Sequence, residues 1–251
     1  MEFFSHLEEF RKRLIYALIP FALASLLSYF FSRPLIDFLT LPLRQTSAQA
    51  ILIFQAPHEA FLIHLKAAAL AGFILTSPVF VAQAWLFVAP GLYPHEKRTL
   101  RQLIVFTVSL FLSGVVFAYA LAIPWGLQFL LSFQTQSLKP LLAVDAYFSF
   151  LIGMMFAFGI LFDFPVIVVG LVQLGIMKSE TLAKSRRLII VMIFVVAAIL
   201  TPSPDPVSQC LLAVPLVVLF EISYWLARFL EERKPAFSEA GPPKPRNVTA
   251  K

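Results

Sequence analysis

The 251-residue chain has one cysteine, nine glycines and little charge. The single Cys210 excludes an internal disulfide. Charged residues make up 14% of the chain and hydrophobic residues 59%, whereas soluble domains average about 25% charged and about 45–50% apolar residues. The shortage of charge excludes an ordinary soluble domain and predicts a polytopic membrane protein.

The sequence also lacks the motifs of common enzyme and nucleotide-binding classes. No glycine-rich phosphate loop followed by lysine is present, which argues against work driven by ATP. His58-Glu59 and His95-Glu96 each begin like a zinc-binding helix, but no second histidine follows at the required spacing. The net charge of +6 does not indicate nucleic acid, because no basic patch is interleaved with stacking aromatic residues. We therefore expect no catalytic residue, no metal and no cofactor.

Six apolar stretches are candidate membrane spans, for which about 20 apolar residues are needed. They are residues 14–31, 67–88, 103–124, 147–174, 188–200 and 207–226. Most lysines and arginines lie before the first stretch, between the second and third, between the fourth and fifth, and after the sixth. Positive residues stay on the cytoplasmic side, so both termini are expected there, as an even number of spans requires.

The last two stretches are short for a bilayer. Residues 188–200 are 13 in number, and Glu221 interrupts residues 207–226. The pair predicts a locally thinned membrane, and a re-entrant hairpin that does not cross remains the alternative. We expect one membrane domain over residues 1–230 and a disordered cytoplasmic tail over residues 231–251, which is rich in proline and charge.

Proline predicts the shape of the bundle. Pro20, Pro78, Pro165 and Pro215 fall inside spans, where each removes a backbone hydrogen bond and kinks its helix. The expected fold is an all-α membrane protein whose six kinked transmembrane helices form a concave bundle.

The N-terminal stretch is amphipathic. Apolar residues recur at helical spacing from Phe3 to Leu14, which predicts an interfacial helix before the first span. Glu9 lies one turn before Arg13, a spacing that favours a surface ion pair. The alternative is that the acidic residues here bind a cationic partner.

Asp163 is the only charged residue between Ala146 and Met177. A carboxylate inside a span costs about 2.5–3.5 kcal/mol on insertion scales, so it usually faces protein or water and has a role. An intramembrane structural hydrogen bond is the alternative.

Several motifs occur in order along residues 5–230. They are His6-Leu7-Glu8-Glu9-Phe10-Arg11-Lys12-Arg13-Leu14, Pro57-His58-Glu59-Ala60-Phe61, Gln83-Ala84-Trp85-Leu86-Phe87, Gly114-Val115-Val116-Phe117-Ala118-Tyr119, and Thr201-Pro202 with Asp205. Together they resemble the TatC family, the multispanning subunit of the twin-arginine (Sec-independent) protein translocase. Two departures are Asp163, where the family usually has glutamate, and an outer loop at Thr201 that is one residue longer than usual.

The resemblance implies a receptor for twin-arginine signal peptides in the bacterial cytoplasmic (inner) membrane. It implies a multimeric complex with the single-span subunits TatA and TatB, which exports folded proteins using the proton-motive force. Signal-peptide binding is expected at Glu9, Glu96 and Arg11, and contact with a partner's membrane helix at Asp163. Residues expected to shape the groove and its outer cap are Phe87, Pro42, Lys66, Tyr119, Asp205 and Gln209.

A small secondary transporter is the alternative function, with Asp163 as a coupling-ion or substrate site. That class tends to show internal repeats and glycine-interrupted helices. The sequence has no such repeat, and its two short spans are adjacent rather than in matching halves.

Overall fold

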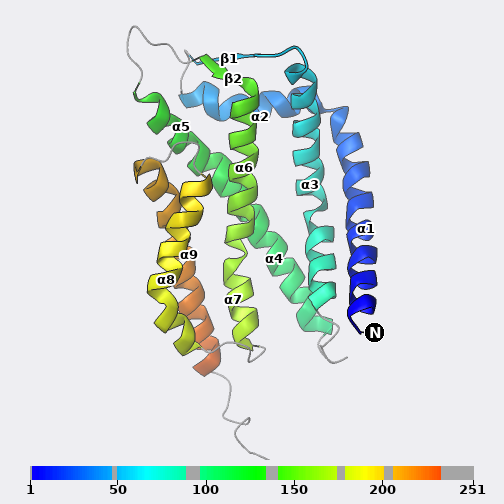
Figure 1. Ribbon diagram of the computed structural model, residues 1–251, viewed down its shortest axis with the longest axis vertical. Helices are drawn as coiled ribbons and strands as arrows, with labels where there is room; N and C mark the ends of the chain where they lie inside the picture. The colour runs from blue at the N-terminus through cyan, green and yellow to red at the C-terminus, as the bar shows by residue number, and fades with distance from the viewer. Residues whose placement is uncertain are drawn as a thin grey trace, which may run out of the picture.

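The computed structural model describes residues 2–46, 50–88, 97–133, 141–173, 179–200 and 206–232. The helices are α1 (Glu2–Tyr29), α2 (Ser32–Thr46), α3 (Glu59–Val88), α4 (Lys97–Phe117), α5 (Ile123–Leu131), α6 (Val144–Phe162), α7 (Phe164–Gln173), α8 (Ser179–Leu200) and α9 (Pro206–Glu232). A π-helical turn, η3 (Ala118–Ala122), joins α4 to α5. Strands β1 (Ile51–Ile53) and β2 (Leu141–Ala143) pair in parallel. Figure 1 shows the long helices running side by side, with α2 and both strands at the end opposite the N-terminus.

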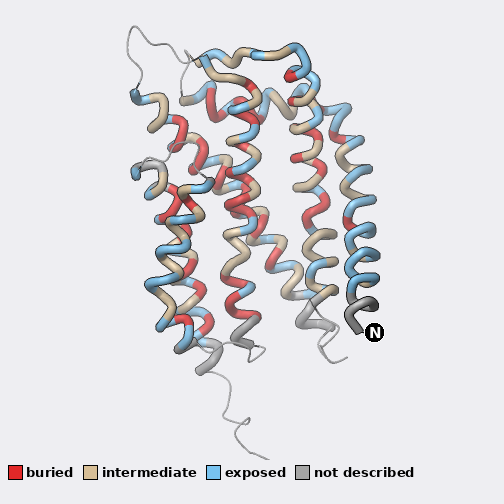
Figure 2. Tube along the Cα trace, in the orientation of Figure 1, coloured by how far each residue is buried: buried red, intermediate tan, exposed pale blue. Residues whose placement is uncertain are grey.

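The helices pack in pairs. α1 lies along α3, α4 packs on α6, and both α7 and α8 pack on α9. Phe148, Leu151 and Phe158 of α6 are fully buried at the centre of the bundle. By contrast α1 is exposed along most of its length (Figure 2), and Leu27 is 65% exposed. An apolar exterior of this extent is what lipid requires and water disfavours.

Small residues permit the closest helix contacts. A Cβ atom at Gly72 of α3 would overlap both the side chain and the backbone of Ser25 in α1. A Cβ atom at Gly159 of α6 would overlap the ring of Phe111 in α4. Glycine at position 72 lets the two backbones approach, as is usual between helices in membranes, and glycine at position 159 leaves room for an aromatic ring.

The prediction of an all-α membrane protein is confirmed. Within the described residues, four segments are long and apolar enough to cross a membrane: Glu59–Phe87, Leu103–Leu131, Val144–Gly170 and Leu212–Phe229. The bent pair Leu7–Tyr29 and Ser32–Thr46 gives a fifth candidate. The predicted span 188–200 belongs to α8, which is not among these segments, so length and composition alone give four or five spans within the described residues where six were expected. Residues 207–226 are not too short after all, because α9 continues past Glu221.

The predicted interfacial helix is not a separate element. α1 is continuous from Glu2 to Tyr29, and the sharp bend, 88°, comes at its other end where α2 begins. α2 itself was not predicted, because Pro34 and Pro42 favour a connecting segment. Pro34 lies in the first helical turn, where a missing N–H leaves no helical acceptor unpaired. Pro42 lies in the helix interior, where a contact described below compensates for it.

The other prolines interrupt their helices less than expected. α1, α3 and α9 continue through Pro20, Pro78 and Pro215. α6 ends at Phe162, three residues before Pro165 of α7, yet the two helices continue as one span. The predicted tail begins within α9, and its residues 233–251 lie outside the described residues.

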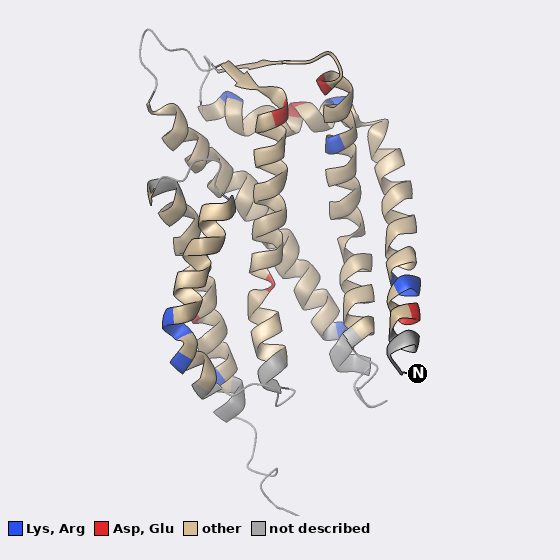
Figure 3. Cartoon of the chain, viewed as in Figure 1, with Lys and Arg blue, Asp and Glu red and all other residues tan. Residues whose placement is uncertain are grey.

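Charged residues lie mainly near the two ends of the bundle (Figure 3). The basic end carries the N-terminal parts of α1, α4 and α8, with Arg13, Arg101 and Lys184. The α2 end carries Lys66 of α3 and Asp145 of α6 together with the charged residues of α2.

Candidate functional site

An apolar cavity of about 270 Å³ opens between α1 and α3 at the basic end. Its lining residues are Phe10, Arg13, Leu14, Ala17, Phe80, Gln83, Ala84 and Phe87. The rings of Phe10 and Phe87 meet edge to face, with centroids 5.6 Å apart. Phe87, expected from the sequence to shape a groove, therefore forms one wall of this cavity. Such a cavity suits an apolar side chain or a short apolar peptide segment.

The Glu9 carboxylate lies beside this cavity, because it is bound to Arg13 in the cavity lining. Arg13 Nη2 and Nε donate to the same Glu9 Oε1, at 2.5 and 3.0 Å. Arg11 is exposed on the same turn of α1. Glu96 lies outside the described residues, so the structure brings together Glu9 and Phe87 among the predicted signal-binding and groove residues.

Asp163 forms the junction between α6 and α7. Its N–H donates to the Ile160 carbonyl, and its own carbonyl accepts from the N–H groups of Val166 and Ile167. The side-chain Oδ1 is buried and has no hydrogen-bond partner within the described part of the chain. A buried acceptor of this kind is expensive when unpaired. Within the described residues this oxygen accepts no hydrogen bond from the chain itself. The alternative of a purely structural intramembrane hydrogen bond therefore has no support from Oδ1.

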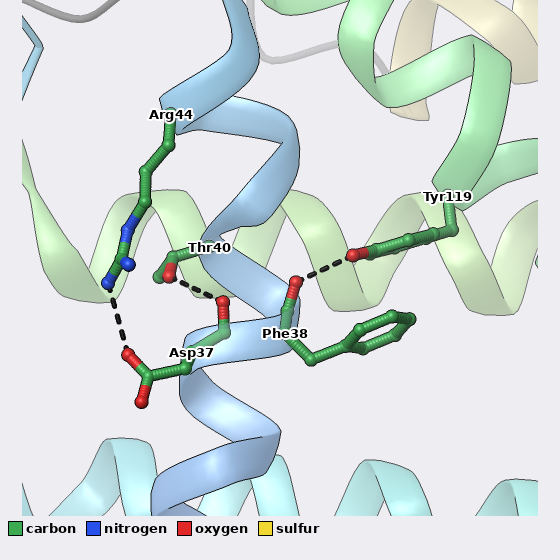
Figure 4. Close-up of polar contacts among 5 residues, drawn as sticks. All are labelled: Asp37, Phe38, Thr40, Arg44 and Tyr119. Carbon is green, nitrogen blue, oxygen red and sulfur yellow. Dashed lines mark hydrogen bonds and ion pairs between the residues drawn. The ribbon is translucent and has the colours of Figure 1, made fainter.

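Pro42 and Tyr119 were both expected to shape the groove and its outer cap. The Phe38 carbonyl lacks a helical donor because of Pro42, and it accepts a hydrogen bond from Tyr119 (Figure 4). Proline has no N–H, so Pro42 cannot donate to the Phe38 carbonyl four residues earlier. The Tyr119 hydroxyl donates to that carbonyl instead, at 2.6 Å. The two rings of Tyr119 and Phe38 stack, with centroids 4.6 Å apart. This pair fastens α2 to η3.

Tyr147 makes a second attachment of α2. Its hydroxyl donates to the Leu39 carbonyl at 2.8 Å, and the residue is buried. Sequence reasoning missed Tyr147, because a tyrosine in an apolar run carries no signal for which backbone group it will meet.

Lys66 and Gln209 each join two helices. Lys66 of α3 donates to Asp145 Oδ1 at 2.6 Å and to Ser149 Oγ at 3.0 Å, both in α6. Gln209 of α9 donates to the Phe194 carbonyl of α8 at 2.8 Å. The Lys66 contacts join α3 to α6 at the α2 end, and the Gln209 contact joins α9 to α8. Asp205 lies outside the described residues.

The chain is similar to translocase proteins over nearly its whole length. The family model for the Sec-independent protein translocase protein (TatC) matches residues 5–215. The TatC protein of Aquifex aeolicus is 38% identical over 237 residues, covering 94% of this chain and 98% of its own length. The Carboxydothermus hydrogenoformans protein is 36% identical over 234 residues (93% and 96%), and that of Escherichia coli 35% over 226 residues (90% and 87%).

A solved structure has the same fold. The crystal structure of the twin arginine translocase receptor TatC superposes with a TM-score of 0.81 at 38% identity, covering 91% of this chain and all of that one. The small-transporter alternative is set aside by these similarities, because they place the chain among protein translocase subunits. The chain is a multi-pass membrane protein that belongs to the TatC family of Sec-independent protein translocase proteins.

Proposed function

We propose that this translocase subunit is the receptor for twin-arginine signal peptides and the core of a complex that exports folded proteins across the bacterial cytoplasmic membrane. The observation that carries the proposal is the Glu9 carboxylate beside an apolar cavity of about 270 Å³. A signal peptide that joins arginines to an apolar stretch would use both features. The similarity to a crystal structure of a twin arginine translocase receptor supports the same function.

Recognition of arginine rests on carboxylates. A guanidinium group pairs with a carboxylate through two parallel N–H···O bonds, which gives geometric selectivity over lysine. Glu9 supplies one carboxylate and Glu96 the second, while Arg11 steers the polar part of the peptide. The apolar stretch of the signal then packs between Phe10 and Phe87, whose rings already line the cavity.

Asp163 is the proposed contact for the membrane helix of TatA or TatB. Its carboxyl group, on a residue that is only partly buried, would accept a hydrogen bond from a polar side chain of that helix. Contacts of α2 through Pro42 and Tyr119, and of α3 through Lys66, would keep the outer end closed while the basic end binds cargo. Gln209 joins α8 to α9, and with Asp205 it would complete the outer cap. The basic end faces the cytoplasm under this proposal, because positive residues stay inside.

A peptide-binding assay tests the receptor function. The full chain in lipid nanodiscs is titrated with a fluorescent twin-arginine signal peptide, and binding is read by anisotropy. Glu9→Gln and Glu96→Gln should each weaken binding about ten-fold or more, because a charge-assisted hydrogen bond contributes about 1.5–3 kcal/mol. Glu8→Gln is the matched control, since Glu8 is exposed on the same helix turn. Wild-type affinity in both variants, or equal binding of an unrelated leader, would remove the proposed function.

A further inference from the structure

We infer that Arg13 is a built-in competitor for Glu9, occupying the carboxylate with an internal guanidinium until the arginine of a signal peptide displaces it. This inference rests on the proposed function and concerns how that site is regulated. It assigns a threshold to the receptor: a ligand must bind Glu9 better than the chain's own arginine does.

The pair engages the carboxylate through one of its two oxygens. Two nitrogens of the Arg13 guanidinium, Nη2 and Nε, donate to Glu9 Oε1 at 2.5 and 3.0 Å. The Arg13 side chain is only 23% exposed and that of Glu9 33% exposed, so water and salt screen the pair less than an ion pair on the open surface. An incoming guanidinium therefore meets a carboxylate that is already engaged.

Helix geometry keeps the Arg13 guanidinium close to Glu9 even when it is displaced. Arg13 follows Glu9 by four residues on α1, so the two side chains lie on one face one turn apart. Tethering by one helical turn gives Arg13 a high effective concentration at the carboxylate.

Arg13 also links the carboxylate to the apolar part of the site. The residue lines the cavity together with Phe10 and Phe87. When its guanidinium leaves Glu9, the side chain that forms part of the cavity wall must move as well. Displacement of one group thus frees the carboxylate and alters the mouth of the cavity in one step.

The competition has a defined thermodynamic signature. Every ligand that engages Glu9 must first break the same pair, so removal of Arg13 should raise the affinity of all such ligands by one common factor. A half-buried pair of this kind predicts a factor of roughly two to five. The preference for arginine over lysine should stay the same. It comes from the shape of the cationic group that each ligand offers to Glu9, a planar fork or a compact ammonium, and not from Arg13.

The experiment compares four variants of the full chain in nanodiscs: Arg13→Gln, Arg13→Met, Glu9→Gln and Glu9→Gln with Arg13→Gln. Arg13→Met keeps an unbranched apolar chain in the cavity wall and removes the charge alone. Lys12→Gln is the charge-matched control, because Lys12 is exposed on the same helix. The probes are a twin-arginine signal peptide and the same peptide with both arginines replaced by lysine. Thermal melting verifies that each variant is folded.

We expect both Arg13 variants to bind each peptide about two- to five-fold more tightly than Lys12→Gln does, with an unchanged ratio between the peptides. In the Glu9→Gln background the Arg13 substitution should have no effect. Weaker or unchanged binding in both folded Arg13 variants would overturn the inference, since Arg13 would then orient Glu9 or be a bystander. If Glu9→Gln binds both peptides with wild-type affinity, Glu9 loses its place in the proposed receptor site and the inference fails with it. If Glu9→Gln weakens binding while the Arg13 variants do not tighten it, the inference alone fails and the proposed function stands.

Discussion

A proline inside a helix leaves one carbonyl group without its amide donor, and here hydroxyl groups replace that donor twice. Pro78 cannot bond the Ile74 carbonyl, and the neighbouring Ser77 hydroxyl donates to it at 2.8 Å. For Pro42 the replacement comes from a distant residue, Tyr119, as Figure 4 shows. A local hydroxyl only repairs its own helix, whereas a distant one also ties two elements together.

Tyr119→Phe should therefore destabilise the chain by about 1 kcal/mol, because the Phe38 carbonyl loses its replacement donor. The same substitution should cost less in a Pro42→Ala background, where residue 42 regains an N–H for that carbonyl. Unfolding of the purified single and double variants in detergent measures this coupling. Equal destabilisation in both backgrounds would show that the hydroxyl does not stand in for the missing amide.

Asp163→Leu should change stability and assembly in opposite directions. Removing a buried, unpaired Oδ1 should stabilise the isolated chain by about 1 kcal/mol. The same change should weaken co-purification with TatA and TatB, because their proposed hydrogen bond is lost. Asp163→Asn is the control of similar shape, and it should retain association better than leucine. A leucine variant that is less stable, or that co-purifies normally, would contradict the assigned role.

At the scale of elements, the contact between α1 and α3 depends on one glycine. The space at Gly72 is taken by Ser25, whereas a Cβ atom at Gly153 of α6 would meet nothing within 4 Å. Gly72→Ala should therefore separate the helices and destabilise the chain by about 1–3 kcal/mol. Gly153→Ala should stabilise it slightly, because alanine is the better helix former by about 0.5–1 kcal/mol. Thermal melting of both variants decides this, and equal effects would contradict the close approach.

The long apolar helices could be predicted from the sequence, because lipid imposes a length and a composition on each of them. α2 could not, since the Tyr119 hydroxyl that compensates for Pro42 is far away in the chain. Strands β1 and β2 could not either. Each has three residues, and their pairing joins segments on either side of α3, α4 and α5.

The sequence predicted individual residues of the candidate site but not the cavity beside them. The motif around Glu9 and the position of Phe87 followed from the family resemblance. The cavity depends on the packing of α1 along α3, which no spacing in the sequence encodes. The same holds for the environment of Asp163, whose charge is visible in the sequence while the lack of a partner for Oδ1 is visible only in the fold.

At the scale of the whole molecule, α8 and α9 form a hairpin whose two helices are joined by an ion pair. Arg186 Nη2 of α8 donates to Glu221 Oε2 of α9 at 2.9 Å, and the Arg186 guanidinium lies 4.8 Å from the Tyr224 ring centroid. Pairing of this kind lowers the penalty for bringing both charges toward the membrane. The short apolar part of α8 is therefore compatible with a helix packed against protein over much of its length.

Whether this hairpin crosses the bilayer is decided by the side on which α9 begins. α8 starts near Lys184 at the basic end, so a crossing α8 carries the start of α9 to the α2 end, whereas a re-entrant hairpin leaves it within the membrane. With Cys210 replaced by serine, Pro206→Cys should react with an impermeant thiol reagent from the same side as Arg44→Cys, because both residues are exposed. Lys184→Cys should react from the opposite side only. Protection of Pro206→Cys from both sides, with the other two positions labelled as expected, would favour the re-entrant hairpin and reduce the number of spans to four.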